Sequence, residues 1–119
     1  MHETLELPAD PAAALELLRT ASRKMPVLVF KRSPICPVSH RAEAELRSYI
    51  GDLEQTDELS LVDIDVIAER SLARGLTAEL EIEHESPQAL FFKDAELVWH
   101  GSHGTLTAKR FKGLSRGEY

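Results

Sequence analysis

Five residues after Pro26 form the short apolar run VLVFK, from Val27 to Lys31. The run is rich in β-branched residues and does not alternate between apolar and polar positions. A strand of this kind is typical of the centre of a sheet whose two faces are both covered. The chain therefore has to supply helices for both faces, which favours an α/β fold built on one central sheet.

Helical patterns alternate with strands on both sides of this run. Asp10 and Pro11 begin a helix over about 10–24, with aspartate as N-cap and proline at the first helical position. Pro37 and Gly51 bound a second helix, which carries apolar residues at i, i+4 and i+8. The other predicted elements are a strand at 59–66, a helix at 71–80 capped by Ser71, strands at 89–93 and 96–100 joined by Asp94-Ala95, and a helix from Thr105 to about Leu114.

The predicted order is therefore α-β-α-β-α-β-β-α. A strand–helix–strand unit needs a right-handed crossover between parallel strands, whereas the closing pair adds an antiparallel edge. The result is a mixed central sheet of about four strands with helices on both faces. This is the element order of a thioredoxin-like domain with an extra N-terminal helix. The 119 residues, of which 43% are hydrophobic, suit a single domain over 1–119 with its core at about 27–114.

The chain holds one cysteine, Cys36, between a predicted strand and a predicted helix. One thiol excludes an internal disulfide and a metal site built from several cysteines. At a helix N-terminus, unpaired backbone N–H groups and the helix dipole stabilise a thiolate. Pro34 and Pro37 flank the cysteine, and Pro37 also stiffens the first helical turn. We therefore expect a reactive thiol here rather than an inert core cysteine.

Ser39 lies three positions after Cys36, where a C-x-x-C redox site has its second cysteine. Its hydroxyl is placed to donate a hydrogen bond to the sulfur, but it cannot resolve a mixed disulfide. An external thiol has to do so, which predicts a monothiol cycle. A phosphatase or arsenate-reductase loop is disfavoured, because it needs an arginine six positions after the cysteine and that position is Ala42.

A proline at the start of a predicted strand supplies the second part of the candidate site. The segment HESPQ places Ser86 and Pro87 directly before strand 89–93. In thioredoxin-like domains a cis-proline at this place faces the active cysteine, and the residue before it presents backbone groups to the substrate chain. No metal site is predicted from the scattered histidines, which lack a familiar ligand order: His40, His84, His100 and His103.

Charge is unevenly distributed along a chain whose net charge is −6. Basic residues dominate 17–42 and 97–117, whereas acidic residues dominate 43–96. Cys36 therefore lies in a basic segment, in which Arg32 and Arg41 are candidates for binding an anionic substrate. The overall acidity and the 6% aromatic content disfavour nucleic acid as a partner.

Nothing in the sequence predicts a membrane partner. No apolar run approaches the roughly 20 residues of a membrane span. The acidic N-terminal segment MHETLELPAD lacks the pattern of a signal peptide. We therefore expect the cytoplasm, where thiols are kept reduced.

Three segments together resemble one known family. SPICPVSHRAE, HESPQALFF and VWHGSHGTLT, in this order and spacing, resemble the YtxJ family of bacillithiol-system proteins. Members are monothiol bacilliredoxins with a thioredoxin-like fold, and the resemblance covers roughly 27–107. It implies that Cys36 is the redox cysteine, that Ser39 replaces the resolving cysteine and that Pro87 is the cis-proline.

The resemblance also implies a reaction. Cys36 would exchange disulfides with bacillithiol, a small thiol carrying malate that acts as co-substrate, and no cofactor would be bound. The expected partners are S-bacillithiolated client proteins and a low-molecular-weight thiol. The dianionic malate would give the basic segment around Cys36 a purpose. Two alternatives remain open, a glutathione-linked monothiol glutaredoxin-like protein and a non-catalytic module that senses thiol status.

Overall fold

The computed structural model describes residues 2–54 and 57–119 and arranges them as a five-stranded sheet covered by helices. The strands are β1 (His2–Thr4), β2 (Val27–Arg32), β3 (Leu59–Asp65), β4 (Gln88–Lys93) and β5 (Glu96–Ser102). The helices are α1 (Pro11–Ala21), α2 (Pro37–Gly51), α3 (Arg70–Glu79) and α4 (Ala108–Ser115), with a 3₁₀ turn, η1 (His103–Thr105), before α4. This is the predicted thioredoxin-like order with one additional strand.

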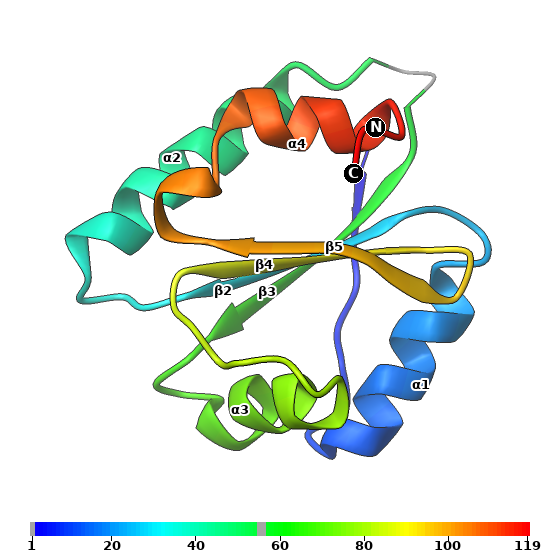
Figure 1. Cartoon of the computed structure of the whole chain (residues 1–119), viewed down its shortest axis with the longest axis vertical. Coiled ribbons are helices and arrows are strands. Elements are labelled where there is room, and N and C mark those ends of the chain that lie inside the picture. The colour runs from blue at the N-terminus through cyan, green and yellow to red at the C-terminus, as the bar shows by residue number, and fades with distance from the viewer. Residues whose placement is uncertain (1, 55–56) are drawn as a thin grey trace.

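The predicted central strand lies at the centre of the sheet, whose strand order is β1-β3-β2-β4-β5. β2 pairs parallel with β3 and antiparallel with β4, and its residues from Val27 to Lys31 are buried. A strand buried on both faces needs cover on both sides. Figure 1 shows this cover, with α2 and α4 on one face and α1 and α3 on the other.

Side chains of β2 alternate between two hydrophobic cores. Val27 and Val29 belong to the core under α1 and α3. Leu28 and Phe30 belong to the core under α2 and α4. By the same alternation Lys31, which is 0% exposed, falls on the α1–α3 side. A fully buried lysine is rare in proteins, and this one lies at the end of β2 that leads to Cys36.

The closing hairpin confirms the predicted turn. Asp94 and Ala95 join β4 to β5 with φ values of 52° and 71°, as a two-residue turn of type I′ requires. Ser22 accepts both turn N–H groups, from Asp94 at 3.0 Å through its carbonyl and from Ala95 at 2.9 Å through its hydroxyl. These contacts tie the hairpin to the end of α1, which stops at Ala21 rather than at about residue 24.

Helix starts follow local signals with two shifts. Asp10 caps α1, because its Oδ2 accepts the Ala13 N–H at 2.9 Å. α3 begins one residue before the predicted cap Ser71, with Glu69 as N-cap. α4 begins at Ala108 rather than at 105, because residues 103–105 form η1 and Thr107 takes the N-cap.

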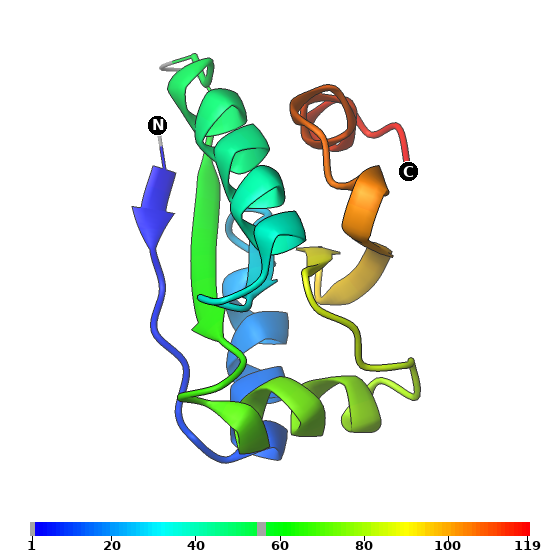
Figure 2. The same cartoon turned by 90° about the vertical axis from the view of Figure 1, so that its left-hand side faces the viewer.

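The sequence does not predict β1, since three exposed polar or charged residues carry no strand pattern. β1 pairs parallel with β3 at the edge of the sheet, from His2 opposite Leu59 to Thr4 opposite Leu61. Figure 2 shows β1 beside β3, with the following segment running along the sheet edge toward α1. The sheet therefore has five strands where about four were expected.

Candidate functional site

Cys36 is the N-cap residue of α2, directly after the loop that leaves β2. Its backbone is extended, with φ −101° and ψ 123°, and its carbonyl accepts the His40 N–H at 3.1 Å. The side chain forms no capping hydrogen bond, and the free thiol is partly buried. Cys36 therefore stands at the positive dipole end of α2, where the first backbone N–H groups have no partner within the helix.

Ser39 is fully buried one turn into α2. Its Oγ accepts the Ser33 N–H at 2.9 Å, and the Ser33 carbonyl in turn lies 3.5 Å from the Cys36 nitrogen. Ser39 thus fixes the loop that carries Cys36. The hydroxyl hydrogen remains to be donated, and its hydrogen bond to the Cys36 sulfur stays a prediction.

The Ser86–Pro87 peptide bond is cis, and Pro87 is buried directly before β4. In the antiparallel ladder of β2 and β4, Lys31 pairs with Gln88. After Lys31, β2 leads into the Cys36 loop. On the partner strand, Ser86 and Pro87 lead into β4 at Gln88. The register therefore brings the two segments to the same end of the sheet, on the left in Figure 1.

The segment at the end of β5 also contacts Pro87. The His103 N–H donates to the Pro87 carbonyl at 3.1 Å. The hydroxyl of Thr105 closes η1 by accepting the Ser102 N–H at 3.1 Å and donating to the Ser102 carbonyl at 2.7 Å. The motif WHGSHG therefore contributes backbone support to the candidate site, while the side chains of His100 and His103 are exposed.

Two further features belong to the segments that carry Cys36 and Pro87. Ile35 and Val38, on either side of Cys36, are 79% and 39% exposed. The Ser86 Oγ is shielded from solvent and has no hydrogen-bond partner among the described residues. A shielded hydroxyl without a partner is uncommon in folded proteins, and this one belongs to the residue directly before Pro87.

The two predicted anion-binding arginines, Arg32 and Arg41, have different surroundings. Arg32 is held by carboxylates, with Nε 3.0 Å from Asp63 Oδ1 and Nη1 3.9 Å from Asp65 Oδ2. Arg41 is exposed on α2. The exposed His40 places Nε2 3.0 Å from the carbonyl oxygen of Pro34, next to the cysteine loop. Arg41 is therefore the more accessible of the two predicted anion-binding arginines.

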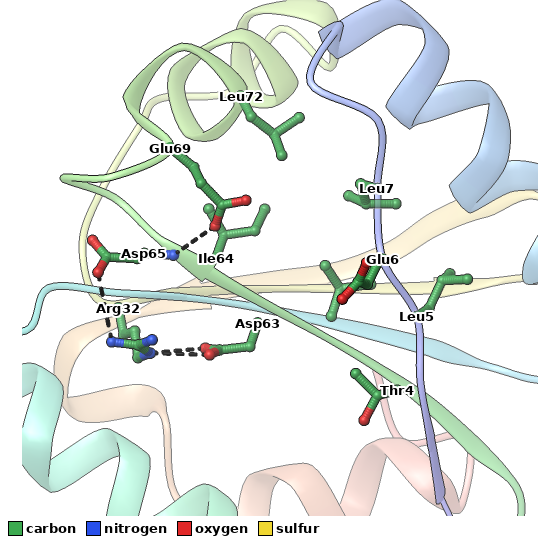
Figure 3. Close-up of a pocket in the computed structure, with 11 residues that line it drawn as sticks. Thr4, Leu5, Glu6, Leu7, Arg32, Asp63, Ile64, Asp65, Glu69 and Leu72 are labelled. Carbon is green, nitrogen blue, oxygen red and sulfur yellow. Dashed lines mark hydrogen bonds and ion pairs between the residues drawn. The ribbon is translucent and has the colours of Figure 1, made fainter.

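Arg32 also lines a pocket of about 450 Å³ at the sheet edge, which Figure 3 shows in close-up. Four acidic residues line the same pocket: Glu6, Asp63, Asp65 and Glu69. Hydrogen bonds from the N–H groups of Ala68 and Ile67 lower the pKa of Asp65, and Arg32 adds to the effect. The pocket thus carries net negative charge and is poorly suited to an anion. Cys36 is not among its lining residues.

A buried polar cluster that the sequence does not predict lies behind the Ser86–Pro87 turn. The Nζ of Lys31 lies 2.7 Å from His84 Nδ1 and 2.7 Å from Gln88 Oε1. The Gln88 side chain also donates to the Glu83 carbonyl at 2.9 Å and accepts the Glu85 N–H at 3.3 Å. The available signals were a lysine ending an apolar run and a glutamine after Pro87, and neither indicates burial by itself.

Two kinds of site are absent from residues 2–54 and 57–119. No three His, Cys, Asp or Glu residues there are grouped so that they could hold a metal ion. In that same part of the chain, no helix combines the length and the apolar character needed to cross a membrane.

Comparison with known proteins identifies a family for the sequence and a fold for the structure. The sequence model of a family described as monothiol bacilliredoxin BrxC matches residues 10–111. A solved structure described by its thioredoxin fold superposes with a TM-score of 0.68 at 23% identity, covering 97% of this chain and 93% of that one. Fasciola hepatica thioredoxin gives 0.64 at 16% identity, covering 98% and 99%. Desulfothioredoxin from Desulfovibrio vulgaris Hildenborough gives 0.63 at 19% identity, covering 98% and 96%.

Proposed function

The chain belongs to the monothiol bacilliredoxin family, and from this premise we propose that it removes bacillithiol from S-bacillithiolated proteins through a mixed disulfide on Cys36. The observation that carries the proposal is one thiol at the start of α2, with buried Ser39 at the position of a resolving cysteine. The Ser86–Pro87 turn at the same end of the sheet supports it. The protein would be a monothiol thiol-disulfide oxidoreductase.

The proposed reaction consists of two disulfide exchanges. The Cys36 thiolate attacks the bacillithiol sulfur of the client's mixed disulfide, the bond to the client sulfur breaks, and the client leaves as a thiolate. Cys36 then carries bacillithiol. The thiolate of a second bacillithiol attacks this adduct, which yields bacillithiol disulfide and frees Cys36. Ser39 cannot perform the second step, because a hydroxyl forms no disulfide.

We assign recognition of the malate group chiefly to Arg41. This side chain is exposed on α2, five residues after Cys36, and is therefore open to an anionic group. Arg32, the other candidate, would first have to give up its carboxylate partners Asp63 and Asp65. We expect the client chain to contact Ser86 and Pro87.

Mass spectrometry of a single-turnover reaction tests the proposal. The reduced protein is mixed with a client carrying one bacillithiol, and both are weighed over time. The client should lose one bacillithiol while Cys36 gains it, because the exchange conserves the small thiol. A client that stays modified, with no adduct on Cys36, would show that the proposed function is wrong.

The release step separates the alternatives. Bacillithiol should remove the Cys36 adduct faster than glutathione at equal thiolate concentration, and each Cys36 should process many clients. Faster release by glutathione would favour the glutaredoxin-like alternative. A protein that reacts once and then stops, even with bacillithiol in excess, would favour the sensing module.

Ser39→Ala should lower stability slightly and slow the transfer without abolishing it. Alanine leaves the Ser33 N–H without its buried partner, a loss of about 1 kcal/mol in the free energy of unfolding. The Cys36 loop becomes less well fixed, while the thiol itself remains. Chemical denaturation and the transfer rate measure both effects. Ser48→Ala, at an exposed serine of the same helix, is the control, and a Ser39→Ala protein as stable as this control would contradict the assigned role.

A further inference from the structure

Lys31 joins the two segments that form the candidate site. It is the last β2 residue paired with β4 before the Cys36 loop, opposite Gln88. Its ammonium group reaches two side chains of the other segment, His84 and Gln88. Ser86 and Pro87 lie between these two contacts along the chain. The turn is therefore anchored to β2 on both of its sides through one side chain.

Burying this lysine is unfavourable for the fold, because its two hydrogen-bond partners are neutral. Burial, and next the positive charge of Arg74 on α3, lower the pKa of Lys31 to about 8, while Glu85 acts in the opposite direction. Burial also lowers the pKa of His84, followed by the charges of Lys31, Arg74 and Arg70 and opposed by Glu85. The imidazole is therefore neutral at pH 7, and its Nδ1 accepts a hydrogen bond from Lys31.

We propose that Lys31 is a positioning residue for disulfide exchange at Cys36, because it holds the Ser86–Pro87 turn against β2, the strand that leads into the Cys36 loop. The inference rests on the proposed function only in that Cys36 exchanges with a protein-bound disulfide. A turn held in this way aligns a client's peptide chain with the sulfur. A small disulfide without a peptide chain does not need that alignment.

Two disulfide probes with the same leaving group test the proposal without bacillithiol. One is the aromatic disulfide DTNB, and the other is a peptide whose single cysteine forms a mixed disulfide with the same aromatic thiol. In both reactions the Cys36 thiolate displaces the coloured aromatic thiolate and forms a new disulfide. Lys31→Met should slow the reaction with the peptide by about tenfold, as expected for loss of alignment. The reaction with DTNB should stay within about twofold.

Two further variants and two contrary outcomes complete the test. His84→Ala removes one of the two contacts and should slow the peptide reaction by about threefold. Lys93→Met, at the exposed far end of β4, should change neither reaction. Unchanged peptide kinetics in Lys31→Met, or an equal loss with both probes, would overturn the proposal. Neither result depends on whether bacillithiol is the natural thiol.

The pH dependence of stability shows whether the cluster forms and whether Lys31→Met folds. Because the pKa of Lys31 falls from its ordinary 10.5 to about 8, the unfolded chain holds a proton that the folded chain lacks between these values. The wild type should therefore gain stability as the pH rises from about 8 to about 10.5, and Lys31→Met should lack this gain. At pH 7 the variant should unfold at no lower denaturant concentration than the wild type. An identical pH dependence in both proteins would exclude the buried cluster and the proposal with it.

Discussion

Replacing Cys36 with serine is expected to abolish transfer of bacillithiol while the protein stays folded. The hydroxyl of serine is almost entirely protonated at neutral pH and is a poor nucleophile without an adjacent base. It also forms no disulfide, so the intermediate cannot exist. The rate of client release, followed by mass spectrometry, should fall by at least about 1,000-fold.

The position of Cys36 allows the loss of activity to be separated from a loss of stability. Cys36 is the N-cap of α2 and forms no capping hydrogen bond through its side chain. Serine is among the preferred N-cap residues, because its oxygen accepts an N–H from the first helical turn. Cys36→Ser should therefore be as stable as the wild type or more so, by up to about 1 kcal/mol. Release within tenfold of the wild type would contradict the assignment of Cys36 as the catalytic residue.

Cys36→Ala completes the comparison, because it removes the thiol without supplying a capping oxygen. Both variants should be inactive, but only serine should stabilise α2. A higher denaturation midpoint for Cys36→Ser than for Cys36→Ala would show that a capping oxygen stabilises α2. The cysteine of the wild type would then provide a reactive thiol at the cost of this helix stability. Such an exchange is a recognised feature of functional sites.

Local patterns in the sequence were sufficient for most of the fold. The run VLVFK identified the central strand, and Pro37 with Gly51 identified the whole of α2. Asp94-Ala95 identified the hairpin. Each of these elements is specified by residues next to it in the chain. The place of Cys36 at the start of α2 followed from the same local signals.

The missed features depend on contacts between distant residues. β1 becomes a strand because β3 offers an unpaired edge, and nothing in HET indicates this. Arg32 donates a hydrogen bond to Asp63 across the β2–β3 pair, so its charge is paired although the sequence places it in a basic segment. Lys31 can be buried because the side chains of Gln88 and His84 form hydrogen bonds with its ammonium group. In each case the partner lies more than 30 residues away in the chain.

The structure also explains why glycine occupies position 75 inside α3. In the sequence it weakens the prediction of the helix at 71–80, because glycine is a poor helix former. In the structure a Cβ at this position would lie 2.2 Å from Pro11 Cγ and 2.7 Å from Pro11 Cβ. The proline ring cannot rotate away, so glycine is what allows α1 and α3 to approach each other over their common core.

Gly75→Ala should therefore lower the free energy of unfolding by about 2 kcal/mol, because overpacking costs up to about 3 kcal/mol and alanine's helix propensity returns about 1. The melting temperature should fall by about 5–10 °C. Gly51→Ala, in a helix where a Cβ meets nothing within 4 Å, should be neutral or slightly stabilising.

The double variant Pro11→Ala with Gly75→Ala decides whether the contact with Pro11 is the cause. Alanine at position 11 removes the ring atom that lies 2.2 Å from the added Cβ, so the two changes together should cost less than the sum of their separate effects. Strict additivity would mean that the contact with the Pro11 Cγ is not the cause of the destabilisation. Transfer by the folded fraction should be unchanged in all these variants, since neither residue belongs to the candidate site.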